Sequence, residues 1–209
     1  MQQHPGTGFF SSTFSTFTQA GLCAALLLAG NLASAQKQVA SVEATATGSS
    51  ASNTLAELRD LLPQHRLSGR SRLTVWGFDV YDASLWVAPG FQADQLSAQP
   101  FALELSYLRN FTNTDIAERS IAEMRRLSPL SDAQASNWTA AMLRVFPNIK
   151  KGDRITGVYR PGTGAAFLVN GKSAGDIPDA EFARLFFAIW LSPKTSDPKL
   201  RSALLAGLQ

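Results

Sequence analysis

Apolar residues alternate with polar ones between residues 101 and 108, which is the pattern of a strand with one buried face, and the length and β-branched content of residues 72–87 indicate two earlier strands. We expect strands at about residues 72–76 and 78–87, joined at Gly77, and a third at about residues 101–108. The face of the third strand that we expect to be buried carries Phe101, Leu103, Leu105 and Tyr107.

Two helices are predicted after these strands, because the apolar spacing changes to three and four residues. Thr112-x-x-Asp115 resembles a capping box at the start of the first helix, and Ser131-x-x-Gln134 begins the second, which closes at Phe146-Pro147. The apolar stripes are Ala117, Ser120, Ile121, Met124 and Leu127 on the first helix, and Ala135, Trp138, Met142 and Val145 on the second.

Strand signals return between residues 152 and 175. Residues 152–160 and 165–169 flank a Pro-Gly-Thr-Gly turn, and Asn170-Gly171 makes a second tight turn. Pro178 then opens a helix whose segment 182–191 is apolar nearly all round, and a last helix follows from Ser196 to near Gly207. This order of elements predicts an α+β protein, in which Phe182, Leu185, Phe186 and Ile189 are buried against the face of Leu103 and Leu105.

The first 35 residues resemble a signal peptide. They contain no Lys, Arg, Asp or Glu, they carry an apolar run at residues 20–30, and Ala33-Ser34-Ala35 precedes Gln36 as a small-x-small cleavage site. We expect a signal peptide at 1–35, a flexible leader at 36–54 and one domain at 55–209, in a periplasmic or secreted protein. A retained membrane anchor is the alternative; after cleavage we expect no stable membrane insertion.

Composition excludes several classes of function. The net charge of +3 comes from scattered Lys and Arg, so nucleic-acid binding is not indicated. After cleavage the chain would have one histidine, His65, and no cysteine, so a zinc site or a His/Cys nucleophile lacks residues. No phosphate-binding or nucleophile-elbow motif occurs, and no cofactor or metal is implied.

An ordered set of motifs resembles the chalcone isomerase-like family, in its exported bacterial branch. The motifs are Arg72…Phe78-Asp79-Val80-Tyr81-Asp82-Ala83-Ser84-Leu85-Trp86, Tyr107-x-Arg109, Phe146-Pro147…Lys151-Gly152-Asp153, Tyr159-x-Pro161-Gly162-x-Gly164, Asn170-Gly171, and Phe187-x-Ile189-Trp190-Leu191…Pro198-x-Leu200-Arg201. The resemblance covers about residues 67–208. It implies an open-faced antiparallel β-sheet with a layer of α-helices packed on it, and a ligand cleft between the two.

The resemblance also implies site residues. Plant enzymes of the family hold a phenolate with a strand arginine, and Arg72 is the best match here, with Arg70 as the fallback. Tyr81 stands where those enzymes place a strand hydroxyl, and Tyr107 is a further candidate ligand contact. The alternatives without a ligand role are that Arg72 pairs with Asp79 or Asp82 at the surface, and that both tyrosines are half-buried sheet residues.

The helix departs from the enzyme pattern, because Ile116 and Glu123 stand where the enzymes have a tyrosine and an asparagine. We expect no catalytic residues and a binding protein for a fatty acid or another small apolar carboxylate. An isomerase of the intramolecular lyase type acting on an aromatic or unsaturated substrate is the alternative, and a purely structural role is a third reading. Glu123 is expected to be solvated, and the tryptophans, including Trp76, to pack in the core or at its rim.

Overall fold

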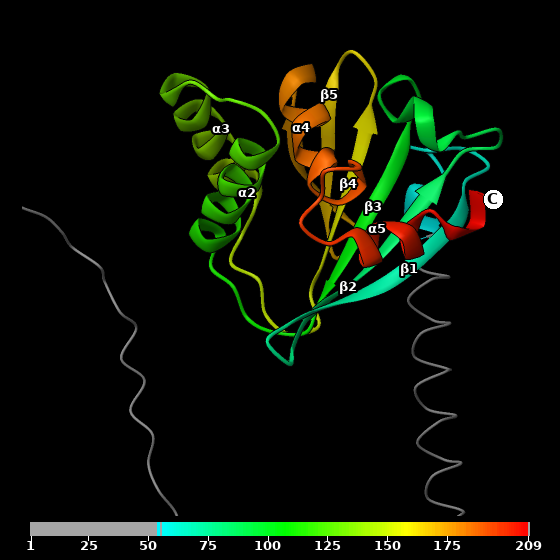
Figure 1. Cartoon of the computed structure of the whole chain (residues 1–209), viewed down its shortest axis with the longest axis horizontal. Coiled ribbons are helices and arrows are strands. Elements are labelled where there is room, and N and C mark those ends of the chain that lie inside the picture. The colour runs from blue at the N-terminus through cyan, green and yellow to red at the C-terminus, as the bar shows by residue number, and fades with distance from the viewer. Residues whose placement is uncertain (1–53, 55, 209) are drawn as a thin grey trace, which may run out of the picture. The chain divides into compact units, whose positions relative to one another are not determined.

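The computed structural model describes residue 54 and residues 56–208; the expected signal peptide and the expected leader up to residue 53 lie outside the described residues. The described part contains a six-stranded antiparallel sheet in which each strand pairs with the next along the chain (Figure 1). The strands are β1 (Arg66–Val75), β2 (Phe78–Val87), β3 (Phe101–Tyr107), β4 (Arg154–Arg160), β5 (Gly164–Val169) and β6 (Lys172–Ile177). The predicted α+β fold with an antiparallel sheet is confirmed.

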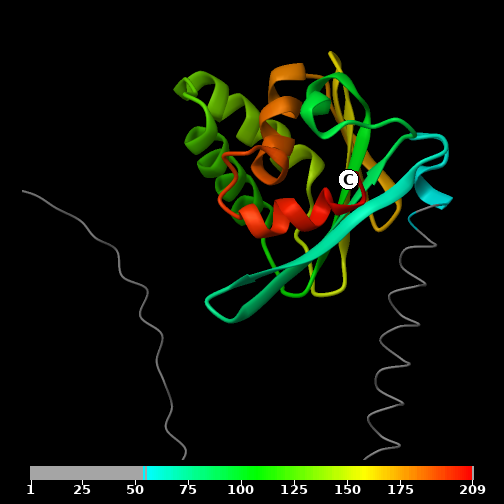
Figure 2. The same cartoon turned by 45° about the vertical axis from the view of Figure 1, so that its right-hand side comes forward.

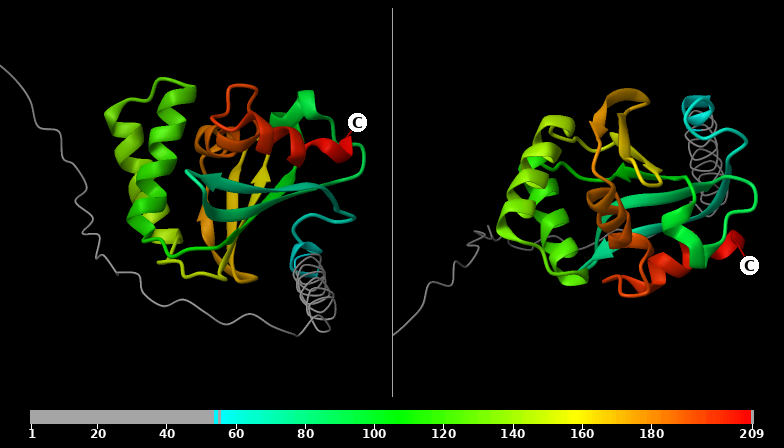
Figure 3. Two further views of the ribbon diagram at one scale, coloured as in Figure 1. Left: turned by 60° about the horizontal axis from the view of Figure 1, so that its bottom comes forward. Right: turned by 90° about the horizontal axis from the view of Figure 1, so that it is seen from above.

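The longer helices lie on one face of this sheet (Figure 3). They are α2 (Asn113–Leu127), α3 (Asp132–Val145), α4 (Ala180–Leu191) and α5 (Pro198–Leu204), with the short 3₁₀ turns η1 (Ala93–Ala98) and η2 (Ala206–Leu208). Helix α4 packs on β4 and β5, α5 crosses β1 and β2, and α3 packs beside β6. Helix α2 packs chiefly on α3 and α4, so it stands off the sheet.

Capping residues fix where α2 and α3 begin. The Thr112 hydroxyl accepts from the Asp115 N–H and the Asp115 carboxylate accepts from the Thr112 N–H, which is a complete capping box. Ser131 and Gln134 form the same reciprocal pair at α3. Both predicted helix starts are therefore confirmed, because each box satisfies N–H groups that the first helical turn cannot.

The helix-facing side of the sheet carries the main core. Phe182, Leu185, Phe186 and Ile189 of α4 are all buried in one cluster with Leu103 and Leu105, as predicted. On the opposite side a smaller apolar cluster places Leu58 and Leu62 against Trp86 and Ala102. There the Arg154 guanidinium also bonds Glu104 and Glu57, each at 2.7 Å, and Thr54, which was expected in the leader, is buried and bonded to Glu104.

The β1–β2 hairpin contains an irregularity that decides which residues face the helices. Val75 pairs with Phe78 and Thr74 with Asp79, but Leu73 pairs with Tyr81 and Arg72 with Asp82. Val80 is therefore an extra residue on β2, a bulge that shifts the register by one. Trp76 and Gly77 form the turn, both with positive φ (50° and 81°), as a type I′ hairpin turn requires.

Candidate functional site

A cavity of about 1140 Å³ lies between the helix-facing side of the sheet and helices α2 and α4. Its space arises because α2 rests on α3 and α4 and not on the sheet. Most of its deep lining is apolar, with Leu103, Leu105, Ile155, Phe167, Phe186 and Phe187 among the contributors. A concave, largely apolar pocket of this size is typical of sites for small organic ligands.

Gly157 on β4 is the residue on which two aromatic rings of the cavity wall rest. A Cβ atom at Gly157 would lie 3.0 Å from Cζ of Phe187 and 3.1 Å from Cε1 of Phe167. These contacts are tighter than ordinary packing, so a larger residue would push both rings. The absence of a side chain here lets two aromatic rings lie against the sheet.

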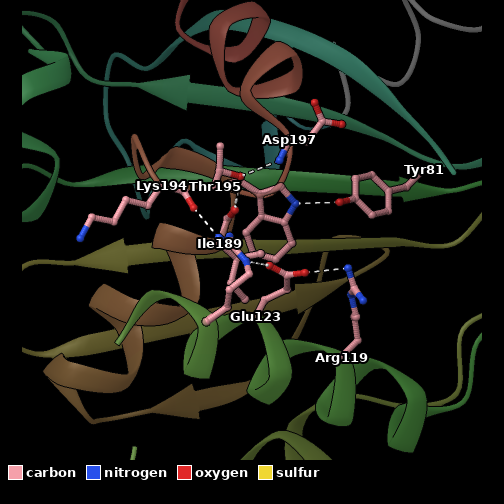
Figure 4. Close-up of polar contacts among 9 residues, drawn as sticks. Tyr81, Arg119, Glu123, Ile189, Lys194, Thr195 and Asp197 are labelled. Carbon is pink, nitrogen blue, oxygen red and sulfur yellow. Dashed lines mark hydrogen bonds and ion pairs between the residues drawn. The ribbon is translucent and has the colours of Figure 1, made fainter. Parts of the chain in front are cut away.

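Tyr81, which the sequence singled out, lines the cavity from β2. Its hydroxyl oxygen accepts a hydrogen bond of 2.8 Å from Nε1 of Trp190 on α4 (Figure 4). Burial raises the pKa of Tyr81 to about 12, and the indole bond opposes that effect only in part. The phenol is therefore neutral at ordinary pH, and because its oxygen accepts from Trp190, its proton is available to another group.

Tyr107, the second predicted tyrosine, lies directly opposite Tyr81 across the β2–β3 ladder. The two rings meet edge to face with centroids 6.0 Å apart, and both line the cavity. Burial raises the pKa of Tyr107 above its ordinary value. Among the described residues its hydroxyl forms no hydrogen bond, so two phenolic O–H groups are free at this end of the cavity.

The structure does not bring Arg72 or Arg70 to the cavity, which corrects the sequence prediction. Arg72 pairs across the ladder with Asp82, and Arg70 with Ser84, on the side away from the helices. The Arg72 guanidinium donates to Asp82 at 2.7 and 2.9 Å and to Asp79 at 2.9 Å. The bulge at Val80 is the cause, because without it a two-residue turn would place Arg72 opposite Tyr81. The surface ion pair considered as the alternative is what forms.

Arg109 is the cationic residue that the cavity offers at its tyrosine end. It follows Tyr107 by two residues at the end of β3, and it lines the cavity. Its guanidinium carbon lies 4.9 Å from the centroid of the Phe78 ring, a cation–π contact. In the part of the chain that the structure describes, no carboxylate forms an ion pair with it. A permanently charged side chain with free donors suits an anionic ligand.

Glu123 on α2 is buried and ion-paired, and the expectation of a solvated charge was wrong. Its two oxygens accept from Nη2 of Arg119 at 2.6 Å and from Nε of Arg126 at 2.9 Å (Figure 4). Arg126 also donates to the Lys194 carbonyl at 2.7 Å, which ties α2 to the segment after α4. Glu123 and Arg119 line the cavity, and together with Arg126 they carry one net positive charge.

Sequence reasoning missed Arg109, Arg119, Trp190 and Glu123 as cavity residues. The spacing of Arg119, Glu123 and Arg126, four and three residues apart on one helix, was the available signal for the ion-paired group. Ile116 lines the cavity as an apolar residue. Among the described residues, no cluster of three or more His, Cys, Asp or Glu side chains is placed to hold a metal ion.

Comparisons with known proteins agree with this architecture. A fatty-acid binding protein of Arabidopsis thaliana superposes with a TM-score of 0.52 over 68% of this chain and 87% of that one, at 12% identity, which shows a shared fold. An uncharacterized protein of Haemophilus influenzae is 29% identical over 131 residues; the match spans 62% of this chain and 63% of the relative's length. The sequence pattern of the chalcone isomerase-like family matches residues 64–206. The chain therefore belongs to the chalcone isomerase-like family.

Proposed function

We propose that this protein binds a fatty acid, or another small apolar carboxylate, in the cavity and does not transform it. The observation that carries the proposal is the uneven polarity of the cavity. Two phenolic hydroxyls and one cation without a carboxylate partner lie at one end. The wall also contains the ion-paired Arg119 and Glu123, but its deeper part is mostly aromatic and aliphatic. The shared fold with a plant fatty-acid binding protein supports the ligand class.

The polar end suits a carboxylate in particular. Tyr81 and Tyr107 each have an O–H group to donate, and the Arg109 guanidinium has no carboxylate partner among the described residues. Hydrogen bonds from charged or phenolic donors to a carboxylate are short and stronger than bonds between neutral groups. A carboxylate bound here would keep its charge, because the arginine compensates for the water that it loses.

The apolar part suits a hydrocarbon chain. Leu103 and Leu105 of β3 face Phe186 and Phe187 of α4, and all four are buried. Each methylene group removed from water contributes about 0.8 kcal/mol of favourable transfer free energy. The ligand's tail would therefore supply most of the affinity, and its carboxylate would fix its direction.

The isomerase alternative receives less support from the same geometry. The family's enzymes are expected to use a tyrosine and an asparagine on the helix that corresponds to α2. Here Ile116 offers no hydrogen bond from its side chain, and both oxygens of Glu123 already accept from arginines. Acceleration of chalcone ring closure by the purified protein would contradict the non-catalytic reading.

The ligand class is tested by titration calorimetry with a long-chain fatty acid and with the fatty alcohol of the same length. We expect the acid to bind at least about tenfold more tightly, since one hydrogen bond to a charged group contributes about 1.5–3 kcal/mol. Mass spectrometry of small molecules extracted from natively purified protein would identify the natural ligand. Absence of binding by the acid would overturn the proposal.

We also propose that the protein acts after export, in the periplasm or outside the cell. The support is the uncharged apolar segment and the Ala33-Ser34-Ala35 site ahead of Gln36. Within the described part of the chain, no helix is long and apolar enough to cross a bilayer. Amino-terminal sequencing should find Gln36 first. An intact Met1 on protein from the cytoplasmic fraction would contradict export.

A further inference from the structure

The tip of the β1–β2 hairpin exposes three large apolar side chains. The exposed fraction is 94% for Trp76, 60% for Phe78 and 41% for Val75, whereas the other tryptophans of the domain are buried. The expectation that Trp76 packs in the core or at its rim was wrong. Concentrated exposure of this kind marks an interaction site more often than a scattered apolar residue does.

The tip is held away from the body of the sheet. β2 pairs with β3 from Tyr81 onward, and the Val80 carbonyl accepts from the Leu108 N–H, so residues 74–79 extend beyond β3 as a two-stranded arm (Figure 2). The turn itself is regular, with Val75 paired to Phe78 across Trp76 and Gly77. The apolar side chains are therefore presented on an ordered hairpin that projects past its neighbours.

Basic residues lie beside this arm. The Arg109 guanidinium lies over the Phe78 ring, and the loop carrying the exposed Lys150 and Lys151 is joined to the same end of β3. That junction includes hydrogen bonds from the Gly152 N–H to the Tyr107 carbonyl at 2.8 Å and from the Lys151 N–H to Asn110 Oδ1 at 2.9 Å. Figure 1 shows the hairpin tip and these loops at the same end of the domain.

The acidic residues at this end accept hydrogen bonds from within the domain, and Asp82 accepts from Arg72. Asp79 accepts from Arg72 and Thr74, and Asp153 accepts from the Lys150 N–H and from Asn170. Asp115 accepts from Thr112 in the cap of α2. Arg109, Lys150 and Lys151 form no ion pair among the described residues. The surface around the tip thus carries charges of both signs, and three basic side chains outside any ion pair lie next to the exposed apolar groups.

The same tip forms part of the cavity wall. Val75, Trp76, Phe78 and Arg109 all line the cavity while remaining exposed to solvent, which places its opening at the arm. Three side chains make too small a patch for a standard protein interface, which buries about 800 Å² on each partner. Aromatic residues flanked by lysine and arginine are instead the usual composition of a contact with a bilayer surface.

We propose that this hairpin tip docks reversibly on an anionic membrane surface. Trp76 and Phe78 enter the boundary between headgroups and acyl chains, and Arg109, Lys150 and Lys151 contact lipid phosphates. The cavity then opens toward the lipid, so an acyl ligand can pass between the two without crossing bulk water. That last step rests on the proposed function, but docking itself does not.

Docking is tested by flotation of the purified protein with two kinds of vesicle, phosphatidylcholine alone and phosphatidylcholine mixed with phosphatidylglycerol. The wild type should bind the mixed vesicles, and binding should weaken as salt is added. Trp76→Ser and Phe78→Ser should each lower the bound fraction severalfold. Leu143→Ser, at an exposed apolar residue of α3, is the matched control and should change nothing.

The charge contribution is tested with the double variant Lys150→Glu, Lys151→Glu, which alters no cavity residue. Its affinity for mixed vesicles should fall at least about tenfold, since each basic residue near such a surface contributes about 1 kcal/mol. Its affinity for a fatty acid in vesicle-free solution should stay unchanged. Three results would overturn docking: the wild type binds both vesicle types equally, it binds neither, or the Trp76→Ser variant binds as well as the wild type. If the wild type bound no fatty acid in solution, the proposed function would be overturned instead, and docking would not.

Discussion

Trp190 donates a 2.8 Å hydrogen bond from its indole Nε1 to the hydroxyl oxygen of Tyr81, linking α4 to β2 at the wall of the cavity. The bond fixes the Tyr81 oxygen as an acceptor and leaves its proton for a ligand. It also satisfies the indole N–H of a buried tryptophan, which would otherwise lack a partner.

Tyr81→Phe should therefore weaken two properties at once. Loss of the acceptor should lower the free energy of unfolding by about 1 kcal/mol, and loss of the donor should weaken fatty-acid binding by about 1.5–3 kcal/mol. Chemical denaturation and calorimetry measure the two effects. Trp190→Phe is the matched control, since it removes the same bond but keeps the phenol. If Tyr81→Phe bound the acid as tightly as the wild type, the phenol would not be a ligand contact.

The buried tyrosines predict a loss of stability at alkaline pH. Burial raises the pKa of Tyr81 to about 12 and raises those of Tyr107 and Tyr159 as well, whereas tyrosines of the unfolded chain ionise near 10.0. Between these values the folded state holds more protons than the unfolded state, so the free energy of unfolding falls as pH rises from about 10 to about 12. Denaturation measured across this range should show the decline, and Tyr81→Phe should reduce it. A decline of equal slope in that variant would exclude Tyr81 as a contributor.

Phe186 is expected to be the most costly single residue to truncate in α4. Its ring is buried and contacts the rings of Phe146, Phe167, Phe182 and Trp190, among others. Phe186→Ala should lower the free energy of unfolding by about 3–5 kcal/mol, as large-to-small core changes do. Leu143→Ala, at an exposed position, should change it by no more than about 0.5 kcal/mol. Equal melting temperatures for the two variants would contradict the packing described.

Local sequence signals were sufficient to predict much of the fold. The capping boxes at Thr112 and Ser131 placed both helix starts, because cap chemistry depends on residues three apart in sequence. β1 was placed too late, at about residue 72 and not at Arg66, because its early residues lack a clear alternation. The alternation is interrupted at Gly69, which cannot carry a side chain because a Cβ there would lie 2.0 Å from the Ala203 carbonyl oxygen of α5. A close approach between elements this distant in sequence has no local signature.

The candidate site was predictable only in part. Tyr107 falls on the predicted buried face of β3, and Tyr81 was identified through the family resemblance; both line the cavity. Arg72 does not reach the cavity. The face of the sheet on which it lies depends on the single extra residue Val80, because a one-residue shift in register moves a strand's side chains to the other face. Glu123 was misjudged because a polar residue beside arginines has the same pattern whether it is solvated or buried with them.

We expect a carboxylate to bind at the tyrosine end of the cavity through Arg109 and not through Arg72. Calorimetric titration of one long-chain fatty acid into the wild type, Arg109→Ala and Arg72→Ala tests it most directly. We expect Arg109→Ala to weaken binding by about 1.5–3 kcal/mol. Arg72→Ala should leave binding unchanged and, as an exposed ion pair, alter stability by no more than about 1 kcal/mol. Wild-type affinity in Arg109→Ala, or a loss of affinity confined to Arg72→Ala, would contradict the account.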